Sequence, residues 1–190
     1  MAAPVTKTGH LWSSPGHSET YARARGNRLR FAISFPPMTD LLNAVKGVLN
    51  AYEPVEGLVT GGQPELTHLA ALKGAGCNVV IDTRDPMEPQ PFDPPAAVRA
   101  AGLEYINIPV SHTPLDDRAL EEMRRVLAGA DSKRVFAYCN SGNRVGAALI
   151  PYLVLDRRVT EDEAVNTAMR IGTRQADLLE WGLSYVRRHR

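Results

Sequence analysis

A cysteine and an arginine stand at the two ends of a short polar loop in the last third of the chain. The segment reads Tyr138-Cys139-Asn140-Ser141-Gly142-Asn143-Arg144-Val145-Gly146. It follows an apolar, β-branched run and precedes a helical apolar pattern, so we expect it to join a buried strand directly to a helix. Backbone N–H groups in such a turn, together with the positive end of the helix, form a cradle for an anion.

Cys139 would lie at the base of this cradle. The inward-facing amides, the helix end and the Arg144 guanidinium all favour thiolate over thiol, which predicts a nucleophile near neutral pH. Arg144 can bind two oxygens of a tetrahedral oxyanion in a planar fork, and Gly142 permits a positive φ or a close backbone approach. The alternative for any cysteine is a buried structural residue. We expect that of Cys77, which has no such neighbours.

Strands and helices alternate along the chain and must position this loop. Apolar runs predict strands at 58–60, 77–82, 103–110 and 134–138. Helical periodicity and capping patterns predict helices at 40–49, from 64, at 96–101, 114–129 and 145–155, from 160 and from 173. This order predicts an α/β fold with a central, mostly parallel sheet covered by helices on both faces.

Ligands of such sheets bind beyond the carboxyl ends of the strands. Three segments should converge there, at 82–85, 111–117 and 139–144. Protonation of a leaving group requires a general acid, and Asp116, Asp117 and Asp85 are the candidates. Arg84 would add positive potential and, with Asp85, line the substrate site. The alternatives are an ion-paired loop arginine at 84 and, for Asp116, an acid that only stabilises a helix N-terminus.

Composition restricts the class of protein. The chain has 190 residues, 44% of them hydrophobic, and a net charge of +1, which fits one globular domain without a field for nucleic acid or a membrane surface. Two cysteines form no disulfide framework, and five histidines show no metal-ligand spacing, so we expect a cytoplasmic protein without metal or cofactor. Residues 1–37 hold five basic residues against Glu19 alone. We expect them to be a disordered basic extension before a single domain at 38–190.

The segments around this loop resemble a known family. The chain is similar, over about residues 52–155, to bacterial proteins related to dual-specificity and protein tyrosine phosphatases, close to the phosphatase-like domain of beta-lactamase hydrolase-like proteins. The resemblance rests on Gly61-Gly62-Gln63-Pro64, Val79-Val80-Ile81-Asp82-Thr83-Arg84, Tyr105-Ile106-Asn107-Ile108-Pro109-Val110 and Cys139-Asn140-Ser141-Gly142-Asn143-Arg144-Val145-Gly146.

This resemblance implies a protein tyrosine phosphatase-like fold that hydrolyses a phosphomonoester through a phosphocysteine. Cys139 would take the phosphoryl group and Arg144 would bind the phosphate. The amides of Asn140, Ser141, Gly142 and Asn143 would form the cradle. The partner would be a phosphorylated small molecule or a phosphoprotein.

Three departures from the phosphatase pattern keep two alternatives open. Four residues separate Cys139 from Arg144 where phosphatases of this kind have five, Tyr138 replaces a histidine, and Val145 replaces a hydroxyl residue. The shorter loop also resembles that of rhodanese-like sulfurtransferases, in which Cys139 would carry a persulfide. The third possibility is a catalytically weak module that binds phosphate or a phosphoprotein.

Overall fold

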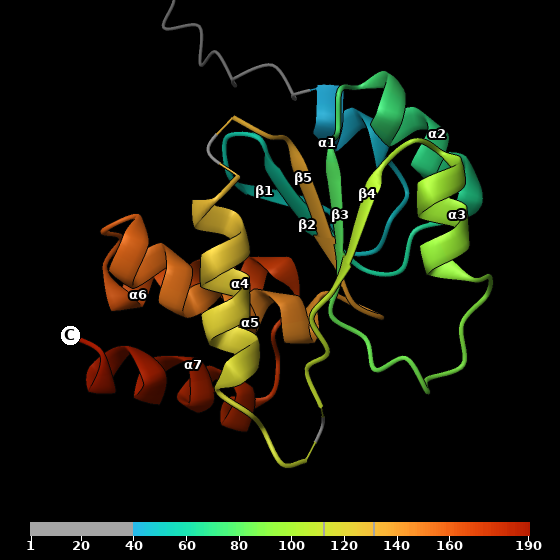
Figure 1. Ribbon diagram of the computed structural model, residues 1–190. Helices are drawn as coiled ribbons and strands as arrows, with labels where there is room; N and C mark the ends of the chain where they lie inside the picture. Colours follow the sequence, from blue (N-terminus) through green and yellow to red (C-terminus); the bar gives the residue numbers. More distant parts are fainter. Residues whose placement is uncertain (1–39, 112, 131) are drawn as a thin grey trace, which may run out of the picture. The chain divides into compact units, whose positions relative to one another are not determined.

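A five-stranded sheet lies between two groups of helices in the computed structural model, which describes residues 40–111, 113–130 and 132–190 (Figure 1). The strands are β1 (Tyr52–Val55), β2 (Leu58–Gly61), β3 (Val79–Asp82), β4 (Glu104–Asn107) and β5 (Val135–Tyr138), in the order β1-β2-β5-β3-β4. Among these five strands, β1 and β2 pair antiparallel and the other neighbours pair parallel. The mostly parallel α/β sheet is therefore confirmed, while the predicted extension at 1–37 lies outside the described residues.

Each face of the sheet is covered by its own helices (Figure 1). Because side chains alternate along a strand, Phe136 and Tyr138 of β5 pack on one face and Val135 and Ala137 on the other. The first face holds α1 (Asp40–Ala44), α2 (Leu66–Gly74) and α3 (Pro94–Ala100); the second holds α4 (Arg118–Ala128), α5 (Asn143–Pro151), α6 (Glu161–Ile171) and α7 (Ala176–Arg188). No helix among the described residues is long and apolar enough to cross a membrane.

The carboxyl ends of the parallel strands lie level with one another. Tyr138 of β5 is in register with Gly61 of β2 and with Asp82 of β3, and Asp82 is in register with Asn107 of β4. The segments that follow these strands consequently meet at one edge of the sheet. The predicted convergence of residues 82–85 and 139–144 therefore has a direct cause in the strand register.

Several boundaries differ from those predicted. The first helix ends at Ala44 instead of residue 49, because Gly47 and Asn50 adopt left-handed backbone angles, with φ of 97° and 55°. Strand β1 was not predicted because it contains Pro54, which an edge strand tolerates. Strand β4 spans four residues of the eight predicted.

The later helices also differ in detail. The helix predicted for 145–155 is α-helical as far as Pro151 and continues as a five-residue π-helix, η1 (Tyr152–Asp156). The change follows Pro151 because proline lacks the N–H that the α-helical hydrogen-bond pattern requires. The last helix begins at Ala176, after Thr173. The capping box predicted for α6 is confirmed, since Thr160 and Glu163 each accept the other's backbone N–H through their side chains.

Candidate active site

Cys139 directly follows β5, and its side chain is 1% exposed. Its Sγ accepts the backbone N–H of Gly142 at 3.1 Å. Gly142 has a left-handed φ of 88°, and α5 begins at the next residue. The predicted strand–loop–helix arrangement is thus confirmed, and the sulfur lies where a loop amide and a helix N-terminus both stabilise negative charge.

The loop and the first turn of α5 pack tightly against the end of α6 and the residues that follow it. A Cβ added to Gly142 would lie 1.9 Å from the backbone oxygen of Ile171, and one added to Gly146 would lie 2.4 Å from Oγ1 of Thr173. Only glycine fits either position. The loop therefore has little room to expand on the side away from the cysteine.

Arg144, on the first turn of α5, is 4% exposed and bound to Glu88. Its Nη2 donates to Oε2 of Glu88 at 2.9 Å, and its Nη1 donates to Oε1 of Glu88 and to the backbone oxygen of Val110, the latter at 3.3 Å. Burial alone would lower the pKa of Arg144, but the bonds to Glu88 and the nearby Cys139 raise it. The guanidinium therefore stays charged beside the cysteine.

Glu88 connects two buried arginines. Hydrogen bonds from Arg144, and then from the backbone of Asp85 and the side chain of Arg84, lower the pKa of Glu88 to about 2 against a partial desolvation. The Asp85 N–H donates to Oε1 at 2.9 Å, and Nε of Arg84 lies 3.4 Å from Oε2. Glu88 is thus a carboxylate at neutral pH, located at the arginine that was predicted to bind an anion.

Arg84 is 3% exposed and holds its own loop in place. Its side chain donates to Oε1 of Gln63, to the backbone oxygen of Pro89 and, at 3.3 Å, to Oε1 of Gln90. The structure therefore brings this predicted substrate-binding residue to the site. Its side-chain donors, however, are directed at protein acceptors, which agrees with the alternative of an ion-paired loop arginine.

A buried carboxylate lies beneath the loop. Asp82 accepts hydrogen bonds from the hydroxyls of Tyr138 at 2.8 Å and Tyr105 at 3.2 Å, and from the backbone N–H of Arg84 at 2.9 Å. Burial raises the pKa of Asp82 and, with the neighbouring carboxylate, that of both tyrosines. Tyr138 directly precedes Cys139 and stands where the phosphatase pattern has a histidine. Its hydroxyl binds Asp82 at the end of β3.

The predicted acids occupy different surroundings. Both oxygens of Asp117 are bound to α7, at 3.0 Å from Nε1 of Trp181 and 2.7 Å from Nη2 of Arg188. Asp116 is exposed and accepts the N–H of Arg118 at 2.9 Å, while Asp85 accepts the N–H of Met87 at 2.9 Å. Within the described part of the chain, none of the three carboxylates has a hydrogen bond to Cys139 or Arg144.

One hollow adjoins the site. It has a volume of about 540 Å³ and its wall includes Glu88, Phe92, Tyr105 and Asn107. A hollow of about 420 Å³ lies at the opposite end of the sheet, around the first residues of β2 and β5, and is remote from Cys139. Among the residues that the structure describes, no three His, Cys, Asp or Glu side chains gather as a metal site.

Sequence reasoning missed Glu88, Asn50 and Thr173, which all contact the site. Asn50 donates to the backbone oxygen of Ser141 and Thr173 to that of Asn143. These residues belong to connections without a motif, and the four-residue spacing of Arg84 and Glu88 indicates an ion pair only within a helix. Gln63, which binds Arg84, could have been found from the sequence, because it belongs to the Gly61–Pro64 segment of the family resemblance.

Comparisons with known proteins identify relatives in sequence and in fold. A beta-lactamase hydrolase-like protein from Agrobacterium fabrum (strain C58) is 28% identical over 112 residues, which are 57% of this chain and 26% of that protein. The matched region thus spans about a quarter of that relative's length.

Solved structures share the fold at low sequence identity. A DUF442 protein from Shewanella putrefaciens CN-32 has a TM-score of 0.68 at 19% identity, covering 78% of this chain and 97% of that one. The core catalytic domain of the PP-IP phosphatase SIW14 from S. cerevisiae has a TM-score of 0.62 at 12% identity, covering 73% of this chain and 86% of that one. Residues 55–150 match the family described as "Beta-lactamase hydrolase-like protein, phosphatase-like domain". The chain therefore belongs to this phosphatase-like family and has a protein tyrosine phosphatase-like fold.

Proposed function

We propose that this protein is a cysteine-dependent phosphatase that hydrolyses a phosphomonoester through a phosphocysteine. The observation that carries the proposal is the Gly142 N–H, which points at Sγ of Cys139 from the N-terminus of α5, with Arg144 buried beside it. The substrate would be a phosphorylated small molecule or a phosphoprotein.

Arg144 retains capacity for an anion despite its bond to Glu88. A guanidinium has five N–H donors, of which two are directed at Glu88 and one at Val110. Among the described residues, the other two donors have no oxygen acceptor, and the guanidinium also has a side-chain hydrogen bond to Cys139. That number suits two oxygens of a phosphoryl group, while Glu88 holds the guanidinium in a fixed orientation.

The reaction would proceed in two displacements. The Cys139 thiolate attacks phosphorus, an S–P bond forms, and the P–O bond to the leaving group breaks as an acid protonates the departing oxygen. Water then attacks the phosphocysteine, and the S–P bond breaks to release phosphate and the thiolate. The amides of Asn140 to Asn143 and the Arg144 guanidinium would stabilise the charge of the transferring group.

The general acid in this scheme is Asp116 or Asp117, with Asp85 as the other candidate. Phenyl phosphate needs more leaving-group protonation than p-nitrophenyl phosphate, so loss of the true acid slows phenyl phosphate hydrolysis more. We therefore expect one of the substitutions Asp116→Asn, Asp117→Asn and Asp85→Asn to lower kcat selectively for phenyl phosphate. An equal loss of kcat with both substrates would show that the residue has a structural role and is not the general acid.

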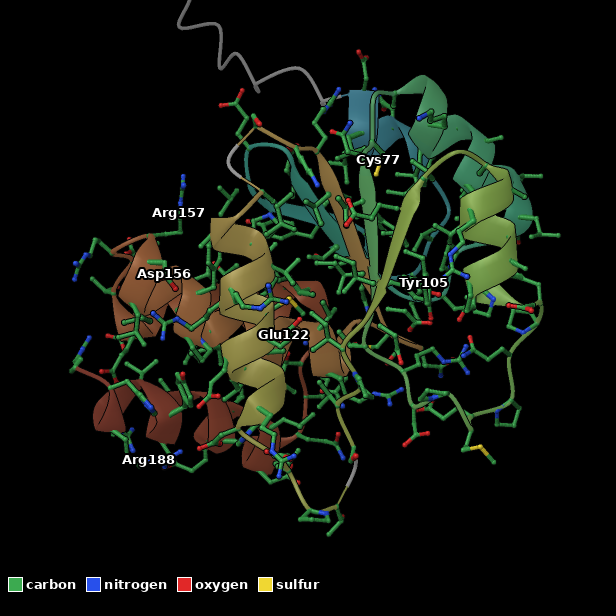
Figure 2. All side chains as sticks on the ribbon, viewed as in Figure 1. Cys77, Tyr105, Glu122, Asp156, Arg157 and Arg188 are labelled. Atoms are coloured by element: carbon green, nitrogen blue, oxygen red, sulfur yellow. The ribbon has the colours of Figure 1, made fainter. Side chains whose placement is uncertain are left out.

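The central test is the release of phosphate from p-nitrophenyl phosphate. We expect vanadate-sensitive turnover that Cys139→Ser abolishes. Cys77→Ser is the matched control, because burial raises the pKa of Cys77 to about 11 and this residue precedes β3 at the amino-terminal end of the sheet (Figure 2). Full activity of Cys139→Ser would refute the assignment of the nucleophile.

A sulfurtransferase is the second candidate, and the loop length favours it. Four residues separate Cys139 from Arg144, which is the loop length of the rhodanese-like resemblance. Cys139 would take the outer sulfur of thiosulfate, forming an S–S bond as sulfite leaves, and cyanide would remove that sulfur as thiocyanate. Thiocyanate formation without phosphate release would support this candidate. Phosphate binding with neither activity would indicate a binding module.

A further inference from the structure

Two residues outside the Cys139–Arg144 loop have no part in the proposed reaction, yet the side chain of each binds a backbone carbonyl of the loop. Asn50, between α1 and β1, donates from Nδ2 to the oxygen of Ser141 at 2.8 Å. Thr173, between α6 and α7, donates from Oγ1 to the oxygen of Asn143 at 2.9 Å. We infer that Asn50 and Thr173 are positioning residues that turn the peptide groups of the Cys139–Arg144 loop so that their N–H groups face the cysteine.

The inference follows from the planarity of the peptide bond. In a trans peptide, the carbonyl of one residue and the N–H of the next point in opposite directions. Asn50 binds the Ser141 carbonyl on the outer side of the loop, so the Gly142 N–H must point inward, and it does point at Sγ of Cys139. Thr173 fixes the Asn143 carbonyl in the same way, which turns the Arg144 N–H away from Thr173.

The Asn140 carbonyl completes the pattern, although its donor is a backbone group. It accepts the N–H of Gln63 at 3.1 Å, so the Ser141 N–H is also turned away from the outer side. Three separate connections of the fold thus hold three loop carbonyls. Side chains hold the other two: Asn50 binds the carbonyl of Ser141, which precedes α5, and Thr173 binds that of Asn143, the first residue of α5.

Both donors are closely packed, although Asn50 is only half-buried. Thr173 is fully buried, and Gly146 has no room for a Cβ beside its hydroxyl. A Cβ on Gly172 would lie 2.7 Å from the Ser141 oxygen and 2.8 Å from Nδ2 of Asn50. Asn50 itself has a φ of 55°, a left-handed conformation that asparagine adopts more readily than most residues. Packing around Thr173 and the backbone conformation of Asn50 therefore hold the two donors in place.

The inference rests on the proposed function only for its kinetic consequence. A loop amide that no longer faces the cysteine stops stabilising the transferring phosphoryl group, so kcat should fall more than the affinity for the ground state. Removal of one such donor lowers turnover by about 100-fold in acyl-transfer enzymes. We expect a loss of roughly 10- to 100-fold in kcat for Thr173→Val, with KM changed by less than about 3-fold.

Thr173 offers a matched set of variants. Thr173→Val keeps the shape and removes the hydroxyl, while Thr173→Ser keeps the hydroxyl and should restore turnover. Thr60→Val is the control, because Thr60 is equally buried and its Oγ1 also donates to a backbone oxygen, that of Tyr52 at 3.1 Å, within the β1–β2 hairpin. Asn50→Gly tests the second donor, with Arg158→Gly as a control at another left-handed position, where φ is 61°.

Hydrogen exchange of the Gly142 amide tests the geometry without any need for turnover. We expect this amide to exchange at least about 10-fold faster in Asn50→Gly than in the wild type, relative to the amides of β5, because its bond to Sγ is weakened. Unchanged exchange in Asn50→Gly together with unchanged kcat in Thr173→Val would overturn the inference. If the wild type has no phosphatase activity, the proposed function fails, but the exchange rates of Asn50→Gly and Arg158→Gly still decide whether the carbonyl donor orients the loop.

Discussion

Glu88 should make the stability of the protein depend on pH in a defined way. Its carboxylate is bound by Arg144, the Asp85 N–H and Arg84, and its pKa is about 2 instead of 4.5. A carboxyl with a lowered pKa in the folded state stabilises that state above its unfolded pKa and loses the effect as the pH falls toward the folded pKa. The contribution of Glu88 is on the order of 3 kcal/mol at pH 7, and about 2 kcal/mol of it is lost by pH 3.

The substitution Glu88→Gln removes the charge and keeps the shape and one acceptor. We expect it to lower the free energy of unfolding by about 3 kcal/mol at pH 7, because Arg144 remains buried without a counter-charge, but by only about 1 kcal/mol at pH 3. Urea denaturation followed by circular dichroism at the two pH values measures both differences.

Glu122→Gln is the control for this experiment. Glu122, on α4, pairs with Arg125 at the surface, and the hydrogen bond lowers its pKa as well (Figure 2). An exposed pair of this kind contributes at most about 1 kcal/mol, so this variant should remain close to the wild type at both pH values. If Glu88→Gln destabilises the protein equally at pH 7 and pH 3, its ionised carboxylate is not the source of the stability and the reasoning fails.

Three further substitutions test other parts of the site. Gly142→Ala places a Cβ 1.9 Å from the Ile171 oxygen at a left-handed φ, so we expect a loss of more than about 2 kcal/mol in a thermal melt. Asp82→Asn should change stability by less than about 1 kcal/mol, because burial raises the pKa of Asp82 and disfavours the charge that the substitution removes; urea denaturation at pH 7 tests this. Asp117→Ala should cost about 1–2 kcal/mol in the same assay through the lost bond to Trp181.

The architecture could be predicted because its signals are local. The runs at 77–82 and 134–138 are apolar and β-branched, and the helices between them carry caps and periodic apolar residues, so the parallel order followed from connection rules. Strand β1 could not be predicted, since Pro54 is a strand breaker except at an edge. Its position at the edge depends on the order of the whole sheet, and no window of sequence contains that order.

The candidate site likewise has a part that could be predicted from local sequence and a part that could not. Cys139, Gly142 and Arg144 belong to one strand–turn–helix segment, so their proximity was predictable from spacing alone. Glu88 and Thr173 reach that segment from connections 56 and 30 residues away from their partners Arg144 and Asn143. Their roles depend on backbone angles and packing that arise only in the folded chain, and no residue pattern marks them.

The charges at the site explain why a nearly neutral chain has a centre suited to anions. Arg84 and Arg144 are both buried, and buried charges require partners. Glu88 bonds to both arginines but supplies only one negative charge, and Asp82, whose pKa burial raises, binds two tyrosine hydroxyls and a backbone amide instead of a guanidinium. The two buried guanidinium groups therefore share one directly bonded carboxylate, which leaves an excess of positive charge within this hydrogen-bonded group. A thiolate or a bound oxyanion would balance it, so the arrangement that would stabilise the proposed nucleophile would also attract an anionic substrate.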